Sequence, residues 1–145
     1  MDKKIRDIYH TEAITTDLDD TLVEWHNNVI EKTVDQLTEA DVARCIRQDI
    51  FVESATEALL GYLLGDPLAG DLYEGELMEK AADVDETVMR KYSKTIRKIV
   101  GSARETLKNH EWPYDDDGEE KGTFKQAVDA LDRKYLQGEH EGKSF

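Results

Sequence analysis

The chain is poor in residues that cross-link or interrupt a fold. Its 145 residues include one cysteine, Cys45, and two prolines. A single cysteine excludes an internal disulfide and is typical of proteins from a reducing compartment. No stretch approaches the roughly 18 consecutive apolar residues of a membrane span, and the start, Met1-Asp-Lys-Lys, lacks the apolar run of a signal peptide. The sequence therefore predicts a cytoplasmic protein.

The groupings of residues that carry enzymatic chemistry are also missing from the sequence. No metal-ligand spacing relates the cysteine to the four histidines, His10, His26, His110 and His140. There is no glycine-rich phosphate-binding loop and no Ser-His-Asp or Cys-His arrangement. Cys45 lies beside an apolar helical stripe, which favours a buried small hydrophobe over a nucleophile. We therefore expect no catalytic residue, no metal site and no cofactor.

Acidic residues far outnumber basic ones. The chain has 33 acidic and 19 basic residues, and its net charge is −14. Such a surface repels nucleic acids and anionic lipids and attracts basic proteins. Acidity of this kind also keeps proteins soluble. Charge therefore disfavours nucleic acid and membrane as partners, and it leaves open both a role in solubility and a role in recognising a basic protein.

Apolar residues recur at three- and four-residue spacing, and no convincing alternating strand is present. Thr38 can cap a helix, and Gly65, Pro67 and Gly70 can end one. The stripes predict helices over 16–37, 38–50, 52–64, 72–81, 86–109 and 124–135. We therefore expect an all-α fold, a single compact domain of about five to six helices. This domain spans 1–145, with a poorly patterned lead at 1–15 and a frayed tail at 137–145.

One part of this helical pattern, residues 37–85, resembles a known family. Ala40 to Gln48 reads Ala-Asp-Val-Ala-Arg-Cys-Ile-Arg-Gln, and an apolar helix follows. Gly65 to Ala69 then reads Gly-Asp-Pro-Leu-Ala, and Asp71 to Met78 reads Asp-Leu-Tyr-Glu-Gly-Glu-Leu-Met. This ordered series is similar to the small immunity proteins of bacterial contact-dependent growth inhibition (CDI) systems. The resemblance implies a helical toxin inhibitor that binds the C-terminal domain of a cognate toxin.

Two groups of polar residues are expected to play different roles. Residues at helix ends within the family-like core should pair with backbone or neighbouring groups and support the scaffold: Arg47, Gln48, Asp66, Tyr73 and Glu76. Recognition is expected from acids at the start of the 16–37 helix and from an acidic loop at 111–120 that also carries aromatic residues. The predicted partner-binding residues are Asp17, Asp19, Asp20, Trp112, Tyr114, Asp115, Asp116, Asp117, Glu119 and Glu120.

A different resemblance lies within the first acidic group. Asp17-Leu-Asp-Asp-Thr21 matches the DxDxT motif of haloacid-dehalogenase-type phosphatases. That resemblance implies Asp17 as nucleophile and Asp19 as acid/base beside Mg²⁺. The motif needs a buried strand before it, so that both carboxylates enter one crevice of an α/β sheet. The preceding residues 10–16 make a poor buried strand, which favours a helix N-terminus instead.

The sequence thus predicts an immunity protein that is not an enzyme. Its acidic surface would cover the active or substrate-binding surface of a cognate toxin domain, which we expect to be a basic nuclease and specifically an RNase. Two alternatives stay open. One is a haloacid-dehalogenase-type phosphatase that uses Asp17 and Asp19, and the other is an acidic helical adaptor of another basic protein.

Overall fold

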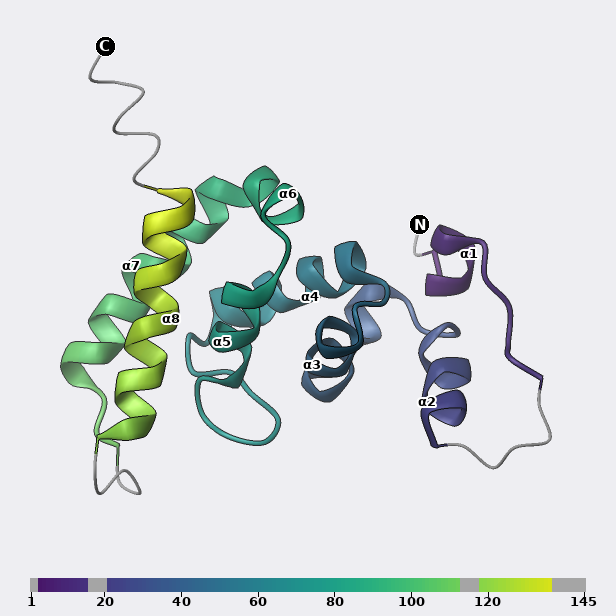
Figure 1. Ribbon diagram of the computed structural model, residues 1–145, viewed down its shortest axis with the longest axis horizontal. Helices are drawn as coiled ribbons and strands as arrows, with labels where there is room; N and C mark the ends of the chain where they lie inside the picture. Colours follow the sequence, from purple (N-terminus) through teal and green to yellow (C-terminus); the bar gives the residue numbers. More distant parts are fainter. Residues whose placement is uncertain (1–2, 16–20, 113–117, 137–145) are drawn as a thin grey trace, which may run out of the picture.

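The computed structural model describes residues 3–15, 21–112 and 118–136, and helices occupy most of them (Figure 1). The elements are α1 (Ile5–Tyr9), α2 (Thr21–Val29), η1 (Val34–Gln36), α3 (Glu39–Gln48), α4 (Val52–Gly65), α5 (Glu76–Asp83), α6 (Glu86–Met89), η2 (Arg90–Tyr92), α7 (Ser93–Asn109) and α8 (Glu119–Tyr135). Within these ranges there is no strand, only an isolated bridge between Lys4 and Thr33. The all-α prediction is confirmed, and the six described helices of eight or more residues agree with the expected number.

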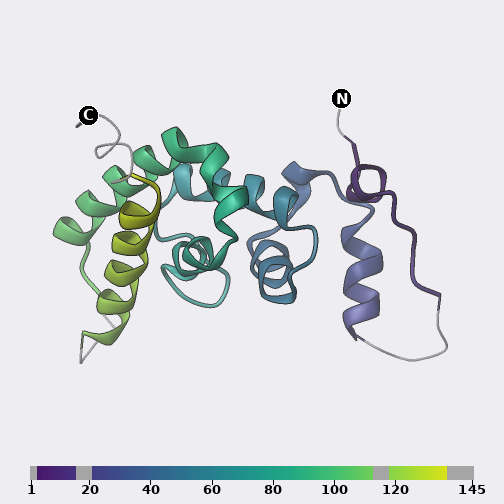
Figure 2. The ribbon, with the colours of Figure 1, turned by 45° about the horizontal axis from the view of Figure 1, so that its top comes forward.

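The helices are arranged in a row. α7 and α8 lie side by side at one end, α3, α4 and α5 occupy the middle, and α1 and α2 form the other end (Figures 1 and 2). One apolar core follows this row, because each amphipathic helix turns its apolar stripe towards its neighbours. Fully or almost fully buried members of the core include Ile5, Val29, Leu37, Leu59, Leu63, Leu77, Met89, Ile99, Phe124 and Leu131. No described helix is both long and apolar enough to cross a membrane.

The N-terminal end is stabilised by main-chain pairing. The carbonyl of Lys32 accepts a hydrogen bond from the Ile5 amide at 2.8 Å, and the carbonyl of Ile30 accepts one from Arg6 at 3.0 Å. These carbonyls would bond within a helix if α2 continued. The single helix predicted over 16–37 is therefore wrong, because α2 ends at Val29 and a separate 3₁₀ turn, η1, follows. Ile5, which begins α1, is fully buried.

The start of α3 follows the prediction and also connects α3 to α2. The Thr38 hydroxyl accepts a hydrogen bond from the Asp41 amide, and the Asp41 carboxylate accepts one from the Thr38 amide, both at 3.0 Å. This reciprocal pair is a capping box. The same carboxylate accepts from Trp25 Nε1 at 3.1 Å and from Lys32 Nζ at 2.6 Å. Asp41 therefore fixes α3 against α2 and the segment after it.

Three other predicted helices begin or continue differently from the pattern. α4 ends at Gly65 as expected, but α5 begins at Glu76, so Leu72 and Tyr73 are not helical. The predicted helix over 86–109 is divided by the 3₁₀ turn η2, and α8 begins at Glu119 rather than at 124.

Cys45 is fully buried as predicted. Burial, and secondarily the charge of Asp41, raises the pKa of its thiol to about 12.

Candidate functional site

Most of the predicted partner-binding residues lie outside the described residues: Asp17, Asp19, Asp20, Tyr114, Asp115, Asp116 and Asp117. Glu119 and Glu120 lie in the first turn of α8, where the helix dipole favours negative charge. Trp112 is half-buried, and its ring centroid lies 4.8 Å from that of His110 and 5.6 Å from that of Phe124. The Trp112 ring thus packs at the α7–α8 end of the core, and its role in binding a partner stays a prediction.

The phosphatase alternative lacks the backbone that its chemistry requires. Residues 11–15, directly before the DxDxT motif, have no regular secondary structure, and the described ranges contain no strand. A parallel sheet with Asp17 at the end of a buried strand is therefore not the architecture found. The described part of the chain also brings together no group of three or more His, Cys, Asp or Glu side chains suited to hold a metal ion.

A second acidic region lies in the middle of the molecule. Residues 48–79 contain no Lys, Arg or His, and they carry eight acids, Asp49, Glu53, Glu57, Asp66, Asp71, Glu74, Glu76 and Glu79. This run extends from the end of α3 through α4 into α5. The acidic run can be recognised in the sequence because residues 48–79 include no basic residue. Four of its polar residues, Gln48, Asp66, Tyr73 and Glu76, were expected to support the scaffold, and the run was not predicted as a candidate surface.

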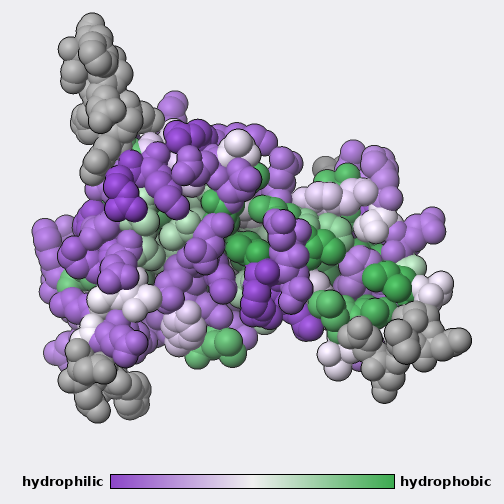
Figure 3. Space-filling view, viewed as in Figure 1, coloured by the Kyte–Doolittle hydropathy of each residue, from purple (hydrophilic) through white to green (hydrophobic). Residues whose placement is uncertain are grey.

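Exposed hydrophobic side chains occur within the same run. Leu64 is 51% exposed, Leu72 is 74% exposed and Tyr73 is 43% exposed. Leu72 and Tyr73 belong to residues 66–75, which we call the α4–α5 loop. Figure 3 shows a small hydrophobic patch at the lower edge of the molecule, where Figure 1 places this loop. Tyr73 precedes α5, so its predicted helical position is wrong, whereas its hydroxyl pairs with the Glu79 side chain as expected.

Two carboxylates, one of them buried, hold the main chain of the α4–α5 loop. Glu76 is 2% exposed, and its Oε1 accepts hydrogen bonds from the amides of Asp71 at 2.7 Å and Leu72 at 3.1 Å. Glu39 of α3 accepts the preceding amide, that of Gly70, at 2.9 Å. Three successive amides are thus bound by carboxylates from two helices. The expected scaffold role of Glu76 is confirmed by these contacts.

The loop is closed by further main-chain contacts that require two glycines. The Gly75 amide donates to the Leu68 carbonyl at 3.0 Å, and Gly75 has a φ of 88°. This left-handed conformation suits glycine, and a Cβ there would meet the Phe124 ring at 2.9 Å. A Cβ on Gly70 would lie 2.2 Å from the Tyr73 carbonyl oxygen. The shape of the loop is therefore fixed by its main chain, by the carboxylates of Glu39 and Glu76, and by the Asp66 carboxylate, which accepts a hydrogen bond from the Leu68 amide at 2.9 Å.

The Tyr73 phenol is oriented by an acid of α5. Its hydroxyl donates to Glu79 Oε1 at 3.2 Å. Partial desolvation, followed by the nearby charge of Glu79, raises the pKa of Tyr73 to about 12, so the phenol is a neutral donor at physiological pH. On the other side of the loop, Glu74 Oε2 lies 2.9 Å from His110 Nε2. The loop thus presents an aliphatic and an aromatic side chain between acids.

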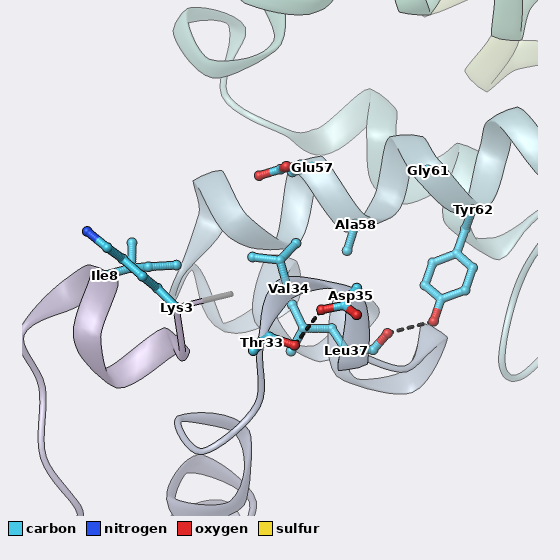
Figure 4. Close-up of a pocket in the computed structure, with 10 residues that line it drawn as sticks. All are labelled: Lys3, Ile8, Thr33, Val34, Asp35, Leu37, Glu57, Ala58, Gly61 and Tyr62. Atoms are coloured by element: carbon cyan, nitrogen blue, oxygen red, sulfur yellow. Dashed lines mark hydrogen bonds between the residues drawn. The ribbon is translucent and has the colours of Figure 1, made fainter. Parts of the chain in front are cut away.

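A separate groove lies towards the N-terminal end, between α1, η1 and α4. It has a volume of about 730 Å³ and is lined by ten residues, whose side chains are drawn in Figure 4. Ile8, Val34 and Leu37 contribute apolar surface, and the Tyr62 hydroxyl donates to the Leu37 carbonyl at 2.6 Å. The charged residues at its edge are of both signs, Lys3, Asp35 and Glu57. The groove therefore shows no preference for a partner of one charge.

Comparison with known proteins gives one match. A family model for CDI immunity proteins matches residues 7–99 of the 145. The matched part runs from α1 into α7 and includes the acidic run at 48–79, the capping box of α3 and the α4–α5 loop. α8 and the acidic loop at 111–120 lie beyond it. No curated protein and no solved structure matches the chain.

Proposed function

Because the chain belongs to the family of CDI immunity proteins, we propose that it neutralises its cognate toxin by covering the toxin's active or substrate-binding surface. The toxin domain in this proposal is a basic nuclease, specifically an RNase. The chain acts as one immunity domain in the cytoplasm, where such a toxin meets its substrate. It performs no chemistry itself and inhibits by occupying a surface.

The net charge of −14 carries the proposal of a nuclease target. Enzymes that bind RNA or DNA place Lys and Arg where the phosphates lie, and so their catalytic surfaces are basic. An acidic protein of complementary shape competes directly with the polyanionic substrate for such a surface. The acids at 48–79, with no cation among them, provide a broad region of the required sign.

The acidic residues predicted from sequence supply long-range attraction in this mechanism. They are Asp17, Asp19, Asp20, Asp115, Asp116, Asp117, Glu119 and Glu120, with Trp112 and Tyr114 as nearby aromatic contacts. Charges at the edge of an interface mainly raise the association rate and make it sensitive to salt. They need no exact geometry to do so, because the attraction acts before the two surfaces meet.

The first test asks whether the chain recognises its toxin. The probe is the C-terminal domain of the CDI effector encoded beside the gene for this chain. We expect it to copurify with the chain, to degrade RNA when alone, and to lose that activity when the chain is added. A domain that does not bind, or that stays active when bound, would contradict the proposal.

The second test separates local attraction from overall charge. The triple variant Asp115→Lys/Asp116→Lys/Asp117→Lys should associate more slowly with the toxin domain and show a weaker dependence of the association rate on salt. The matched control makes the same change of charge on exposed residues of α5–α7, as Asp83→Lys/Glu86→Lys/Glu105→Lys. We expect a smaller effect from the control. Equal slowing by both variants would mean that only the net charge matters.

A further inference from the structure

The α4–α5 loop exposes apolar surface in a way that its role as a connector does not explain. Single exposed hydrophobic residues are normal on protein surfaces. Leu72, however, is 74% exposed, and the next residue along the chain, Tyr73, is 43% exposed. The two side chains extend from a segment whose main chain is fixed on both sides. A rigid segment that displays an aliphatic and an aromatic side chain has the properties of an interface anchor.

The cost of fixing this segment is considerable. A carboxylate that is only 2% exposed loses its hydration, which is unfavourable unless strong hydrogen bonds replace it. Hydrogen bonds from the amides of Asp71 and Leu72 replace the lost hydration of the Glu76 carboxylate. The amide of Gly70 donates to the Glu39 carboxylate in the same way. The result is a backbone that is already ordered where Leu72 begins. A partner that contacts Leu72 therefore does not have to order the loop first.

The charges around the loop specify the partner. Asp66, Asp71 and Glu74 are exposed acids of the loop, and the nearest cation along the chain is Lys80. Exposed apolar side chains that are surrounded by acids disfavour an acidic partner surface, because the like charges repel. They fit an apolar pocket that is bordered by Lys or Arg. The groove between α1, η1 and α4 is not lined by acids alone, since its lining includes Lys3 as well as Asp35 and Glu57.

We propose that the α4–α5 loop is the anchor of the toxin complex, with Leu72 and the Tyr73 ring inserted in an apolar pocket on the basic surface of the toxin domain. This inference rests on the proposed function and assigns different kinetic roles to two groups of residues. The acidic residues accelerate the encounter, and the loop slows dissociation. The two contributions are measurable separately, because one changes the association rate and the other changes the dissociation rate.

The experiment compares four variants with the unchanged chain: Leu72→Ala, Leu72→Gln, Leu72→Ala/Tyr73→Ala and the control Ile14→Ala. Ile14 is 45% exposed, and only its main chain bonds to Asn27, at 2.8 and 3.0 Å. Leu72→Gln retains the length of the side chain and the loop amide but removes the apolar contact. Association and dissociation rates are measured by surface plasmon resonance against the toxin domain encoded by the neighbouring gene, after thermal unfolding has shown that each variant is folded.

We expect Leu72→Ala and Leu72→Gln to raise the dissociation rate about tenfold and the double variant to raise it further. Association should change less than about twofold, and Ile14→Ala should behave like the unchanged chain. Dissociation rates that stay at the original value in all Leu72 variants, or an equal rise in Ile14→Ala, would overturn the anchor. The proposed function would survive that result if the unchanged chain still binds and inhibits. Failure of the unchanged chain to bind would overturn both.

Discussion

Asp41 connects more parts of the fold than any neighbouring polar residue of α3. It is 6% exposed, and its carboxylate receives hydrogen bonds from the Thr38 amide, the Trp25 ring and the Lys32 ammonium. Burial alone would raise its pKa. The bonds from Lys32, Thr38 and Trp25 together outweigh that effect and hold the pKa of Asp41 below its ordinary value. The ionised carboxylate is therefore the form that stabilises the native state.

The pH dependence of stability follows from this shift. Because the pKa of Asp41 is lower in the folded chain, its contribution is complete above the unfolded value of about 4 and is lost as the pH falls through the folded value. Asp41→Asn should lower the free energy of unfolding by about 1–3 kcal/mol at neutral pH. The difference from the unchanged chain should shrink towards pH 3, measured by urea unfolding at several pH values.

An exposed carboxylate provides the comparison for Asp41. Asp7→Asn, on the exposed side of α1, should change the unfolding free energy by no more than about 0.5 kcal/mol at any pH. If Asp41→Asn and the unchanged chain lost stability in parallel on acidification, the hydrogen-bonded carboxylate would not be the group that titrates. A difference that grew as the pH fell would contradict the sign of the shift.

Residue roles were predictable where they depend on local sequence. The pair Thr38 and Asp41 has capping-box spacing, and the burial of Cys45 follows from its place on an apolar stripe. The contacts from Trp25 and Lys32 to Asp41 were not predictable, because they depend on where α2 lies in space. For the same reason Gln48, expected to pair within the scaffold, is exposed, whereas Glu76 is buried and paired as expected.

At the scale of elements, the α4–α5 loop depends on α5 for its shape. Glu76→Ala removes the acceptor for the amides of Asp71 and Leu72 and leaves them without their partner. We expect a loss of about 1–3 kcal/mol in the free energy of unfolding. Gln48→Ala, at the exposed C-terminal end of α3, should change that free energy by less than about 0.5 kcal/mol.

Both variants are compared by chemical denaturation under one set of conditions. Circular dichroism reports the loss of helix, since the described chain is mainly helical. Equal destabilisation by Gln48→Ala and Glu76→Ala would restore the original expectation that both support the scaffold. If Glu76→Ala did not lower the free energy of unfolding, water would replace the carboxylate without penalty. The Glu76 carboxylate would then not be what holds the main chain of the loop in place.

Helix positions were predictable to a useful degree, and helix interruptions were not. Periodicity places α3, α4, α7 and α8 nearly where they lie, because each buries one apolar stripe. The interruption after Val29 arises from carbonyls that bond to α1, which is distant in sequence. The late start of α5 arises from Glu76 binding amides that would otherwise enter a helix. Local patterns contain neither fact, and so residues 72–75 of the loop were predicted as part of a helix.

At the scale of the whole molecule, the net charge of −14 also acts on stability, apart from its proposed role in recognition. Like charges on a folded chain lie closer together than in the unfolded chain, so they destabilise the folded state. Salt screens this repulsion over a distance that falls from about 20 Å at 20 mM to about 7 Å at 200 mM. We therefore expect the melting temperature to rise with NaCl over this range.

Attractive ion pairs reduce the expected rise of the melting temperature with salt, because salt weakens them as well. Arg104 binds Asp129 at 2.6 Å and Asp132 at 3.1 Å, which joins α7 to α8, and salt weakens such half-buried pairs less than it weakens exposed ones. Thermal unfolding should be followed with NaCl and with KCl to separate screening from ion-specific effects. A melting temperature that falls with both salts would show that ion pairs contribute more than the excess of acids.

The way in which the α4–α5 loop is held has an evolutionary consequence. Its fold depends on the main-chain amides of residues 70–72 and on the acceptors Glu39 and Glu76, which lie outside the loop. The side chains of Asp71 and Leu72 take no part in these bonds. Mutation can therefore replace them without altering the path of the backbone. In the proposed complex, substitutions at these positions can follow sequence changes in the toxin while the backbone of the loop is retained. Related immunity proteins could then differ in toxin specificity and still share one fold.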